Sequence, residues 1–362
     1  MSAWIRPLSA SSWVRYQRRA DRAGLIYVND FDEGITRRRC GRGYTYLTPS
    51  GRRLRSIRIR HRIKSLAIPP AWQDVWICPS QRGHIQAVGC DNAGRRQYIY
   101  HPQWSVISTA VKFDRMETFA TLLPKIRRRV RRDLRRKRLC RDRVTAAVIR
   151  MLDRAHLRIG NSKYLQTSGA RGATTLTDDH VEVDDIHIQL DFPGKSGQHR
   201  QVEFRDARVA DVIAECQDLD GQFLFAYPDR RGRPMEIRSS DVNRYLRRVC
   251  RSKVTAKDFR TWAGSVIATD QLCDLPPQTT ESETRRAIRR AVKTTAGRLG
   301  NTPAVCRSSY IHPAILRHAA DGRLPELVQS VQDQCETSAA ELSRNETLFR
   351  ALLPKLDPVV SA

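Results

Sequence analysis

Hydrophobic and polar positions along the chain divide it into two parts with different periods. From about Leu25 to Pro102, apolar residues alternate with polar ones over short runs, as they do in half-buried β-strands. The run GYTYL (43–47) alternates and is followed by the turn sequence TPSG. Two further runs, HIQAVGC (84–90) and RRQYIYH (95–101), flank DNAG, which predicts a β-hairpin. We therefore expect the first part to contain a small sheet.

After Pro102 the apolar period becomes helical. In KIRRRVRRDLRRKR (125–138) the apolar residues recur every four positions, which predicts a helix with one packed stripe and cations on its other faces. The next run, RVTAAVIRMLDRAHLRIGN (143–161), predicts a buried helix that Gly160 ends. The stripe of the first helix consists of Ile126, Val130 and Leu134, and that of the second consists of Val144, Ala147, Val148, Met151, Leu152 and Ala155.

One segment of the second part returns to the β period. The apolar residues of IHIQL (186–190) alternate with polar ones, and PGKSG (193–197) turns the chain into a second strand that ends at Phe204. Lys195 is therefore expected at the tip of a hairpin. From Ser239 onward the pattern is helical again.

These patterns predict an α+β chain. We expect a small β-rich amino-terminal domain over residues 1–102, and a larger, mostly α-helical domain over residues 103–362 that contains a β-hairpin or small sheet. Residues 1–20 carry no acidic side chain and read as a loose basic arm. An acid-containing loop from Asp274 to Glu283 is expected to be exposed.

Charge determines the class of partner. The chain has 65 Lys and Arg against 38 Asp and Glu, a formal net charge of +27, which favours nucleic acid. No stretch approaches the ~18 apolar residues of a membrane helix, and the start lacks the apolar core of a signal peptide, so we expect no membrane partner and a cytoplasmic, nucleoid-associated location. No two of the nine cysteines are two or three residues apart, which argues against a zinc site and favours reduced thiols.

Two basic surfaces are candidates for nucleic-acid contact. On the second strand of the predicted hairpin, two tyrosines share a face with an arginine, which suits stacking on bases and equally suits an ordinary sheet face. The basic run at 125–138 suits a helix that lies along a phosphate backbone. The candidate contact residues are Arg95, Arg96, Tyr98, Tyr100, Arg128, Arg131 and Arg132.

Two capping signals place candidate chemistry on helices. Thr302 as N-cap and Pro303 at the first helical position predict a short helix that carries Tyr310. In TAKDFRTW, Thr255 and Asp258 form a capping box, and an apolar stripe follows.

Four cations and one amide elsewhere in these motifs are further candidates for the chemistry. Each of the cations also has an ordinary structural explanation when it is taken alone. Lys257 and Arg260 are three residues apart, so they share a helix face and can grip one phosphate, or they are ordinary surface cations. Arg158, read as the end of a helix, can complement the helix dipole. Lys195 can be a solvated turn lysine. Asn301 directly precedes the capped helix of Tyr310.

Taken together, these motifs resemble the type IB DNA topoisomerases, in particular the small bacterial and poxvirus-like branch. Their order and spacing agree with the family over nearly the whole chain. The motifs are YLTPSG, IPPAW, GRRQYIYHP, LRIGN, GATTL, FPGKSG, KDFRTW and TPAVCRSSYIHP.

The resemblance implies roles for the residues that match. Tyr310 corresponds to the nucleophile, and Arg158 and Arg260 to the two arginines that clamp the scissile phosphate. Lys195 corresponds to the general acid and Lys257 to a supporting cation.

Asn301 departs from part of the family. It stands where poxvirus members carry histidine and many bacterial members carry asparagine. An asparagine still donates a hydrogen bond to a phosphate oxygen, but it does not titrate. The general acid is therefore not expected at this position.

The resemblance also implies the fold and the reaction. We expect a tyrosine-recombinase-like catalytic domain that closes with the amino-terminal domain as a clamp around double-stranded DNA. Supercoils would be relaxed by transient cleavage of one strand through a 3′-phosphotyrosyl intermediate, strand rotation and religation, by a monomer without ATP, metal or other cofactor.

Two alternatives remain at this point. A tyrosine site-specific recombinase shares the catalytic chemistry, but it usually has His-x-x-Arg where this chain has Lys257-x-x-Arg260, and the β-rich amino-terminal half also favours the topoisomerase. A non-catalytic architectural DNA-binding protein would explain the basic runs but not the complete set of candidate catalytic residues.

Overall fold

The computed structural model describes residues 17, 18, 20–92, 94–276, 280–332 and 341–356. It divides the chain into two compact units between Lys112 and Phe113. Sequence patterns place the division at Pro102, which is the first residue of the long helix α3 (Pro102–Leu134). The basic arm expected over residues 1–20 lies mostly outside the described residues, and so do residues 277–279 of the expected loop.

The first unit is built on a five-stranded antiparallel sheet in the order β2-β1-β3-β4-β5. The hairpin predicted around DNAG is confirmed, because β4 pairs with β5 and the Asp91 amide donates to the Arg95 carbonyl at 2.9 Å. The strands are β1 (Ile35–Cys40), β2 (Gly43–Leu47), β3 (Gln73–Ile77), β4 (Ile85–Cys90) and β5 (Arg96–Tyr100).

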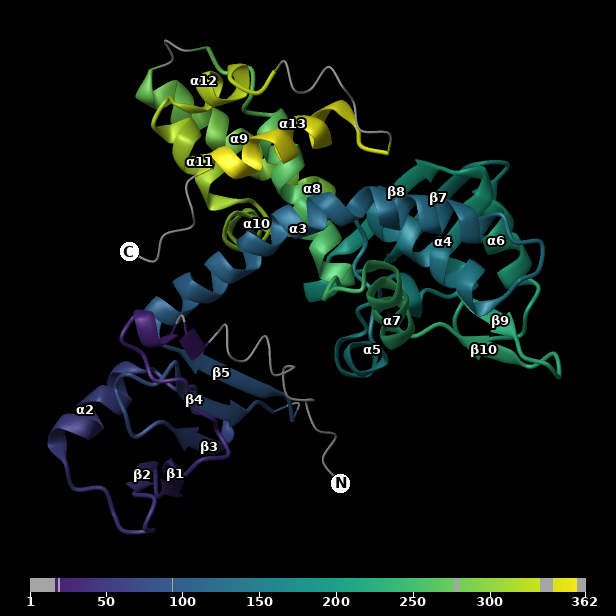
Figure 1. Cartoon of the computed structure of the whole chain (residues 1–362). Coiled ribbons are helices and arrows are strands. Elements are labelled where there is room, and N and C mark those ends of the chain that lie inside the picture. The colour runs from purple at the N-terminus through teal and green to yellow at the C-terminus, as the bar shows by residue number, and fades with distance from the viewer. Residues whose placement is uncertain (1–16, 19, 93, 277–279, 333–340, 357–362) are drawn as a thin grey trace. The chain divides into compact units, whose positions relative to one another are not determined.

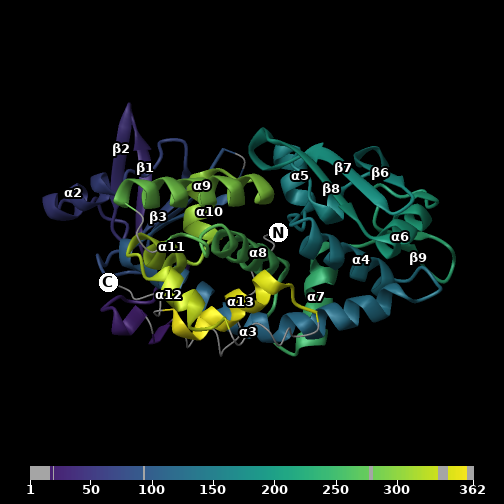
Figure 2. The same cartoon turned by 90° about the horizontal axis from the view of Figure 1, so that it is seen from above.

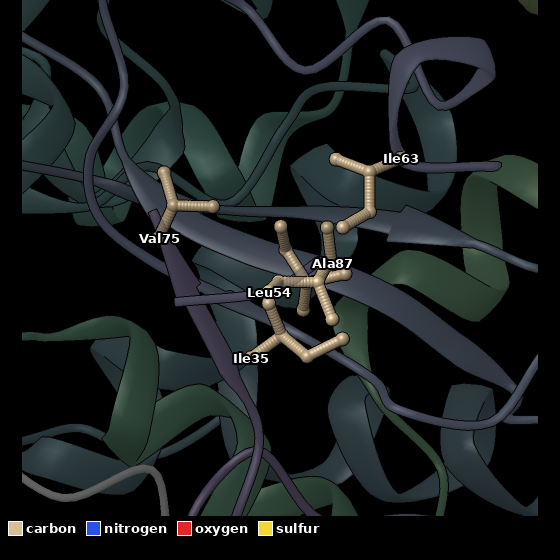
Figure 3. Close-up of a cluster of buried hydrophobic side chains, with 6 residues drawn as sticks. Ile35, Leu54, Ile63, Val75 and Ala87 are labelled. Atoms are coloured by element: carbon tan, nitrogen blue, oxygen red, sulfur yellow. The ribbon is translucent and has the colours of Figure 1, made fainter. Parts of the chain in front are cut away.

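The β-like reading of the first unit missed a helix, α2 (Ile57–Ser65). Its sequence IRIRHRIKS alternates at period two at its start, as a strand does, but Ser56 caps the helix by accepting from the Ile59 amide. Ile57 is 82% exposed, whereas Ile63 is buried in the core of the sheet. That core is formed by Ile35, Leu54, Ile63, Val75, Ile77 and Ala87, most of which are labelled in Figure 3.

The second unit is mostly helical and contains a three-stranded antiparallel sheet in the order β6-β7-β8. These strands are β6 (Val181–Asp184), β7 (His187–Pro193) and β8 (His199–Arg205), and a two-stranded ribbon follows in β9 (Ala226–Pro228) and β10 (Pro234–Glu236). The alternation of β7 is confirmed at Ile188 and Leu190, which are buried. Ile186 is 38% exposed, because it lies in the turn before the strand.

The helices of the second unit pack around one central helix, and one of them, α6, contacts the three-stranded sheet. Figure 1 shows α6 beside α4, and α6 also packs against β6 and β7. None of the helices in the described part of the chain is long and apolar enough to cross a lipid bilayer. After α3 they are α4 (Arg141–Arg154), α5 (Ser162–Ser168), α6 (Ala207–Gln217), α7 (Ser239–Cys250), α8 (Ala256–Asp270), α9 (Glu281–Leu299), α10 (Pro303–Ser309), α11 (Pro313–Ala320), α12 (Leu324–Gln329) and α13 (Arg344–Leu352).

The central helix of the second unit is α8. Every residue from Phe259 to Thr269 is buried, and α8 packs against α4, α7, α9, α11 and α13. Figure 2 shows α8 between α9 and α13. The predicted capping box is confirmed, because the Thr255 amide donates to Asp258 Oδ2 at 2.7 Å. A helix that is covered all round is a rigid base for side chains that project from it.

The end of α4 differs from the prediction. The helix ends at Arg154, not at Gly160, because His156 adopts a left-handed φ of +53°. The following residues leave as an extended segment whose carbonyls accept from the backbone of 173–174, with the Ala173 amide donating to the Arg158 carbonyl at 2.8 Å. Arg158 therefore does not complement the dipole of this helix.

The basic helix α3 has the predicted packed stripe, with Ile126, Val130 and Leu134 all buried. Its cations do not all face solvent. Arg127 donates to Asp153 of α4 through Nε and Nη2, both at 2.8 Å, and to Glu346 of α13 through Nη1 and Nη2, also at 2.8 Å. Two carboxylates thus neutralise this guanidinium in a partly buried network.

The carboxyl-terminal helix α13 completes that network. Trp262 of α8 donates from Nε1 to Glu346 Oε1 at 3.0 Å, and the Ser343 amide donates to Glu346 Oε2 at 2.8 Å. Burial raises the pKa of Glu346, but the hydrogen bonds and charge of Arg127 outweigh burial and leave that pKa below its usual value. The segment after Ala319 therefore has a structural role: it ties α3, α4 and α8 together.

Arg127→Met should lower the free energy of unfolding by about 3–5 kcal/mol, because it leaves Asp153 and Glu346 buried without their cation. Urea unfolding followed by circular dichroism measures this loss. The matched control is Arg128→Met, an exposed neighbour on the same helix, which should change stability by no more than about 0.5 kcal/mol. Equal effects of the two substitutions would show that the network does not stabilise the second unit.

Candidate functional site

Four of the candidate catalytic residues lie together in the second unit, which we call the tyrosine cluster. Its members are Arg158, Arg260, Asn301 and Tyr310. They come from the extended segment after α4, from α8, from the turn after α9 and from the end of α10. The fold thus collects four segments that are distant in sequence.

Arg260 is the most buried cation of the cluster, with 3% of its surface exposed. Its Nη2 donates to the Leu299 carbonyl at 2.7 Å, and its Nη1 donates to the His156 carbonyl. Its Cζ lies 5.0 Å from the ring centroid of Tyr310, a cation–π contact. Burial, followed by the charge of Arg158, lowers the pKa of Arg260 to about 10, although the neighbouring Tyr310 acts in the opposite direction.

Arg158 contacts the turn after α9. Its Nη2 donates to the Gly300 carbonyl at 3.1 Å and to Asn301 Oδ1. Burial lowers the pKa of Arg158. Arg158 therefore orients the amide of Asn301 by holding its oxygen.

Asn301 is placed by the way α9 ends. Gly300 adopts a left-handed φ of +58°, and the Asn301 amide donates back to the Ala296 carbonyl at 2.9 Å, as in a Schellman C-cap. Because Asn301 Oδ1 accepts from Arg158, its Nδ2 remains as the donor of this amide. That Nδ2 and Arg260 Nε are both buried donors without a hydrogen-bond partner in the described part of the chain.

Tyr310 directly follows α10, whose start is as predicted. Thr302 Oγ1 accepts from the Val305 amide at 3.3 Å, and Pro303 occupies the first turn. Ser308 and Ser309 end the helix, and the Ser308 hydroxyl donates to the Ala304 carbonyl at 3.0 Å.

The backbone of Tyr310 rests on α8. Ser265 Oγ lies 3.2 Å from the Tyr310 carbonyl oxygen and accepts from the His312 amide at 2.9 Å. Gly264 allows this close approach, since a Cβ there would lie 2.7 Å from the Tyr310 carbonyl oxygen. The central helix thus holds both Arg260 and the tyrosine.

The two candidate lysines are placed differently. Lys195 is exposed in the short turn between β7 and β8, as the sequence predicts, and Lys257 is exposed on the first turn of α8, one turn before the buried Arg260. Among the described residues, no hydrogen bond or ion pair joins either lysine side chain to the tyrosine cluster. Lys257 and Arg260 share a helix face only at its edge, because one side chain lies in solvent and the other in the core.

Arg200, on β8, was missed by sequence reasoning. It donates from Nη1 to the Gly297 carbonyl at 3.2 Å and from Nη2 to the Arg298 carbonyl at 3.1 Å, both at the end of α9. Arg200 is in phase with Val202 and Phe204 on the less exposed face of β8. A cation at an inward position of a strand is the signal that could have identified it.

The candidate nucleic-acid contacts are partly occupied by acidic partners. In the first unit, Tyr98 and Tyr100 stack with their centroids 5.8 Å apart, and Arg96 is paired with Asp30. Arg95 pairs with Asp91 at 2.8 Å. These carboxylates reduce the charge that the hairpin face presents to a phosphate.

Some of the candidate contact arginines of the basic helix α3 also have an acidic partner, and others do not. Arg131 is paired with Glu341, whereas Arg128 and Arg132 are exposed. In the described part of the chain, no group of three or more His, Cys, Asp or Glu side chains is arranged to hold a metal ion.

Comparisons with known proteins identify relatives over most of the chain. Residues 103–336 match the family described as "Eukaryotic DNA topoisomerase I, catalytic core", and residues 43–91 match "Bacterial DNA topoisomerase IB, N-terminal domain". The chain is 30% identical over 286 residues to DNA topoisomerase 1B of Acanthamoeba polyphaga mimivirus, which covers 77% of this chain and 85% of the relative. DNA topoisomerase 1B of vaccinia virus (strain Copenhagen) is 22% identical over 252 residues, with 67% and 74% covered.

Gly264→Ala should destabilise the chain by about 1–3 kcal/mol, because the added methyl group overpacks the contact between α8 and Tyr310. Gly297→Ala is the control: a Cβ at that position on α9 meets nothing within 4 Å, and the change should be neutral or stabilise by up to about 1 kcal/mol. Urea unfolding of both variants checks the pair. A stable Gly264→Ala chain would contradict the close approach of α8 to the tyrosine.

Proposed function

Because the chain belongs to the type IB DNA topoisomerases, we propose that it relaxes supercoiled double-stranded DNA by cleaving and resealing one strand through Tyr310. The observation that carries this proposal is the uncompensated charge of the tyrosine cluster. Arg158 and Arg260 donate to backbone carbonyls and an amide oxygen, and none of their hydrogen bonds in the described residues is to a carboxylate. Arg127 in the same unit, by contrast, has two carboxylate partners.

Buried cations without an anion point to an anionic ligand. A buried charge is costly unless it is paired, and a phosphodiester would supply the missing charge. The two unpartnered donors, Asn301 Nδ2 and Arg260 Nε, would then bind its non-bridging oxygens. A phosphate at this point would lie beside the ring of Tyr310.

The proposed reaction combines this placement with the chemistry that the family resemblance implies. The Tyr310 oxygen gives up its proton to solvent, attacks phosphorus and forms a bond to the DNA 3′ phosphate, while the bond from phosphorus to the 5′ oxygen breaks. The fixed guanidinium and amide donors stabilise the charge that gathers on the phosphoryl oxygens, and each such donor is worth roughly 10²–10³ in rate. Because the phosphotyrosyl bond conserves the energy of the phosphodiester, the reverse step reseals the strand without ATP.

The leaving 5′ oxygen needs a proton, and we assign this step to Lys195 on the basis of the family resemblance. An exposed lysine at a hairpin tip is free to reach the leaving group once DNA is bound. Lys257, at the start of α8, would add positive charge near the same strand. During religation Lys195 would take the proton back from the attacking 5′ hydroxyl.

The rest of the cycle concerns the whole chain. We propose that the two units close around the duplex as a clamp, that the catalytic unit is tyrosine-recombinase-like, and that the chain acts as a monomer. Tyr98, Tyr100, Arg128 and Arg132 are the contacts proposed outside the cluster. Binding through the two arginines should weaken with salt. A recombinase would instead exchange strands between two defined sites.

Tyr310→Phe should abolish plasmid relaxation and leave no covalent protein–DNA adduct, because it removes the attacking oxygen alone. Relaxation is measured in EDTA without ATP, beside the wild-type chain, and DNA binding by filter retention is the control that should persist. Relaxation by Tyr310→Phe would contradict the proposed function. Relaxation by neither chain, with binding intact, would favour the architectural protein.

Asn301→Asp should slow single-turnover cleavage at least about 10²-fold, because it keeps the acceptor for Arg158 but replaces the Nδ2 donor by an anionic oxygen that faces the phosphate. Asn301→His is the matched control, since it restores a donor as in poxvirus members, and it should cleave much faster than Asn301→Asp. Burst kinetics with an end-labelled duplex gives both rates. Equal rates for the two variants would exclude a phosphate contact by residue 301.

A further inference from the structure

Arg200 is a cation near the tyrosine cluster that the proposed reaction does not use. It lies on β8, five residues after Lys195, and its two terminal nitrogens donate to the last carbonyls of α9 at 3.2 and 3.1 Å. A helix end carries partial negative charge on such carbonyls, and a planar guanidinium can bind two of them at once. Arg200 therefore joins the hairpin to α9.

The aliphatic part of the Arg200 side chain packs closely against Gly194 of the hairpin and Gly300 after α9. A Cβ at Gly194, the neighbour of Lys195, would lie 3.0 Å from Arg200 Cγ. A Cβ at Gly300, the neighbour of Asn301, would lie 2.6 Å from Arg200 Cδ. One side chain thus fills the space between the residue before the candidate general acid and the residue before the candidate phosphate donor.

The surroundings of Arg200 argue against a role in charge alone. Its hydrogen-bond partners are backbone carbonyls. Burial, followed by the positive charge of the neighbouring Arg158, lowers the pKa of Arg200. A side chain that only added positive charge would not need both nitrogens on one helix end. The contacts instead fix a distance between two loops.

We propose that Arg200 is a positioning residue that holds the Lys195 loop against the end of α9, so that the general acid reaches the leaving 5′ oxygen. This inference rests on the proposed function. A second hydrogen bond holds the hairpin independently of Arg200, because the Arg171 amide donates to the Pro193 carbonyl at 2.8 Å. A substitution of Arg200 should therefore leave the hairpin folded and change only the position of its tip.

The test compares two scissile phosphates in an otherwise identical duplex, placed where the wild-type chain cleaves. One has the ordinary 5′ oxygen, and the other has a bridging 5′ sulfur. A thiolate is a much better leaving group than an alkoxide and needs no proton, so sulfur removes the requirement for a general acid. A defect in transition-state charge or in folding persists with sulfur.

Arg200→Met should cleave the oxygen substrate about 10- to 100-fold more slowly than wild type, as expected for a misplaced catalytic group, and the sulfur substrate at nearly the wild-type rate. The double variant Arg200→Met/Lys195→Met should be no slower than Lys195→Met alone. Arg205→Met, an exposed arginine at the far end of the same strand, is the control and should match wild type with both substrates.

Equal slowing of Arg200→Met on both substrates, or no slowing on either, would overturn the inference. So would additive losses in the double variant, since Arg200 would then act independently of Lys195. Circular dichroism checks folding, and Arg200→Lys, which keeps the charge but not the two-pronged contact, should show a smaller sulfur-rescued defect. A wild-type chain that forms no adduct with either substrate would instead overturn the proposed function itself.

Discussion

The buried guanidinium of Arg260 is the interaction on which the arrangement of the site depends. It is satisfied by the carbonyls of His156 and Leu299 and by the ring of Tyr310. These partners come from the segment after α4, the end of α9 and the end of α10. Burying one cation in α8 therefore fixes three separate segments around a guanidinium that donates to the backbone carbonyls of two of them.

The second unit uses buried arginines in two ways. Arg127 is neutralised by Asp153 and Glu346, and the resulting network ties α3, α4, α8 and α13 into a scaffold. Arg158 and Arg260 have no carboxylate partner in the described residues, so their charge is available to a ligand. Arg127 is thus neutralised by carboxylates of the chain itself, whereas we propose that a DNA phosphate neutralises the tyrosine cluster.

Local signals in the sequence predicted much of the fold. The capping residues at Thr255 and Thr302 correctly start α8 and α10, because caps depend on neighbours three residues away. The β4–β5 hairpin follows from its turn sequence for the same reason. The family motifs also named four residues that the fold brings together, although their roles in the reaction stay a proposal.

What could not be predicted depends on contacts between distant segments. The alternation of Ile and Arg at the start of α2 is typical of a strand. The helix is favoured by the burial of Ile63 in the core of the sheet, which the local sequence does not reveal. The basic run of α3 gives no sign that Glu341 and Glu346 will pair with its arginines. The role of Arg200 depends on its hydrogen bonds to carbonyls at the end of α9. No local sequence pattern predicts that the end of α9 lies beside β8.

The most direct test of the central claim is to identify the residue that carries the DNA. A duplex labelled at the 5′ end of the cleaved strand is trapped with the wild-type chain by denaturation, the DNA is digested, and tryptic peptides are sequenced by mass spectrometry. We expect the nucleotide on the peptide 308–317, attached to Tyr310 through a 3′ phosphate. An adduct on any other residue, or one attached through a 5′ phosphate, would contradict the account.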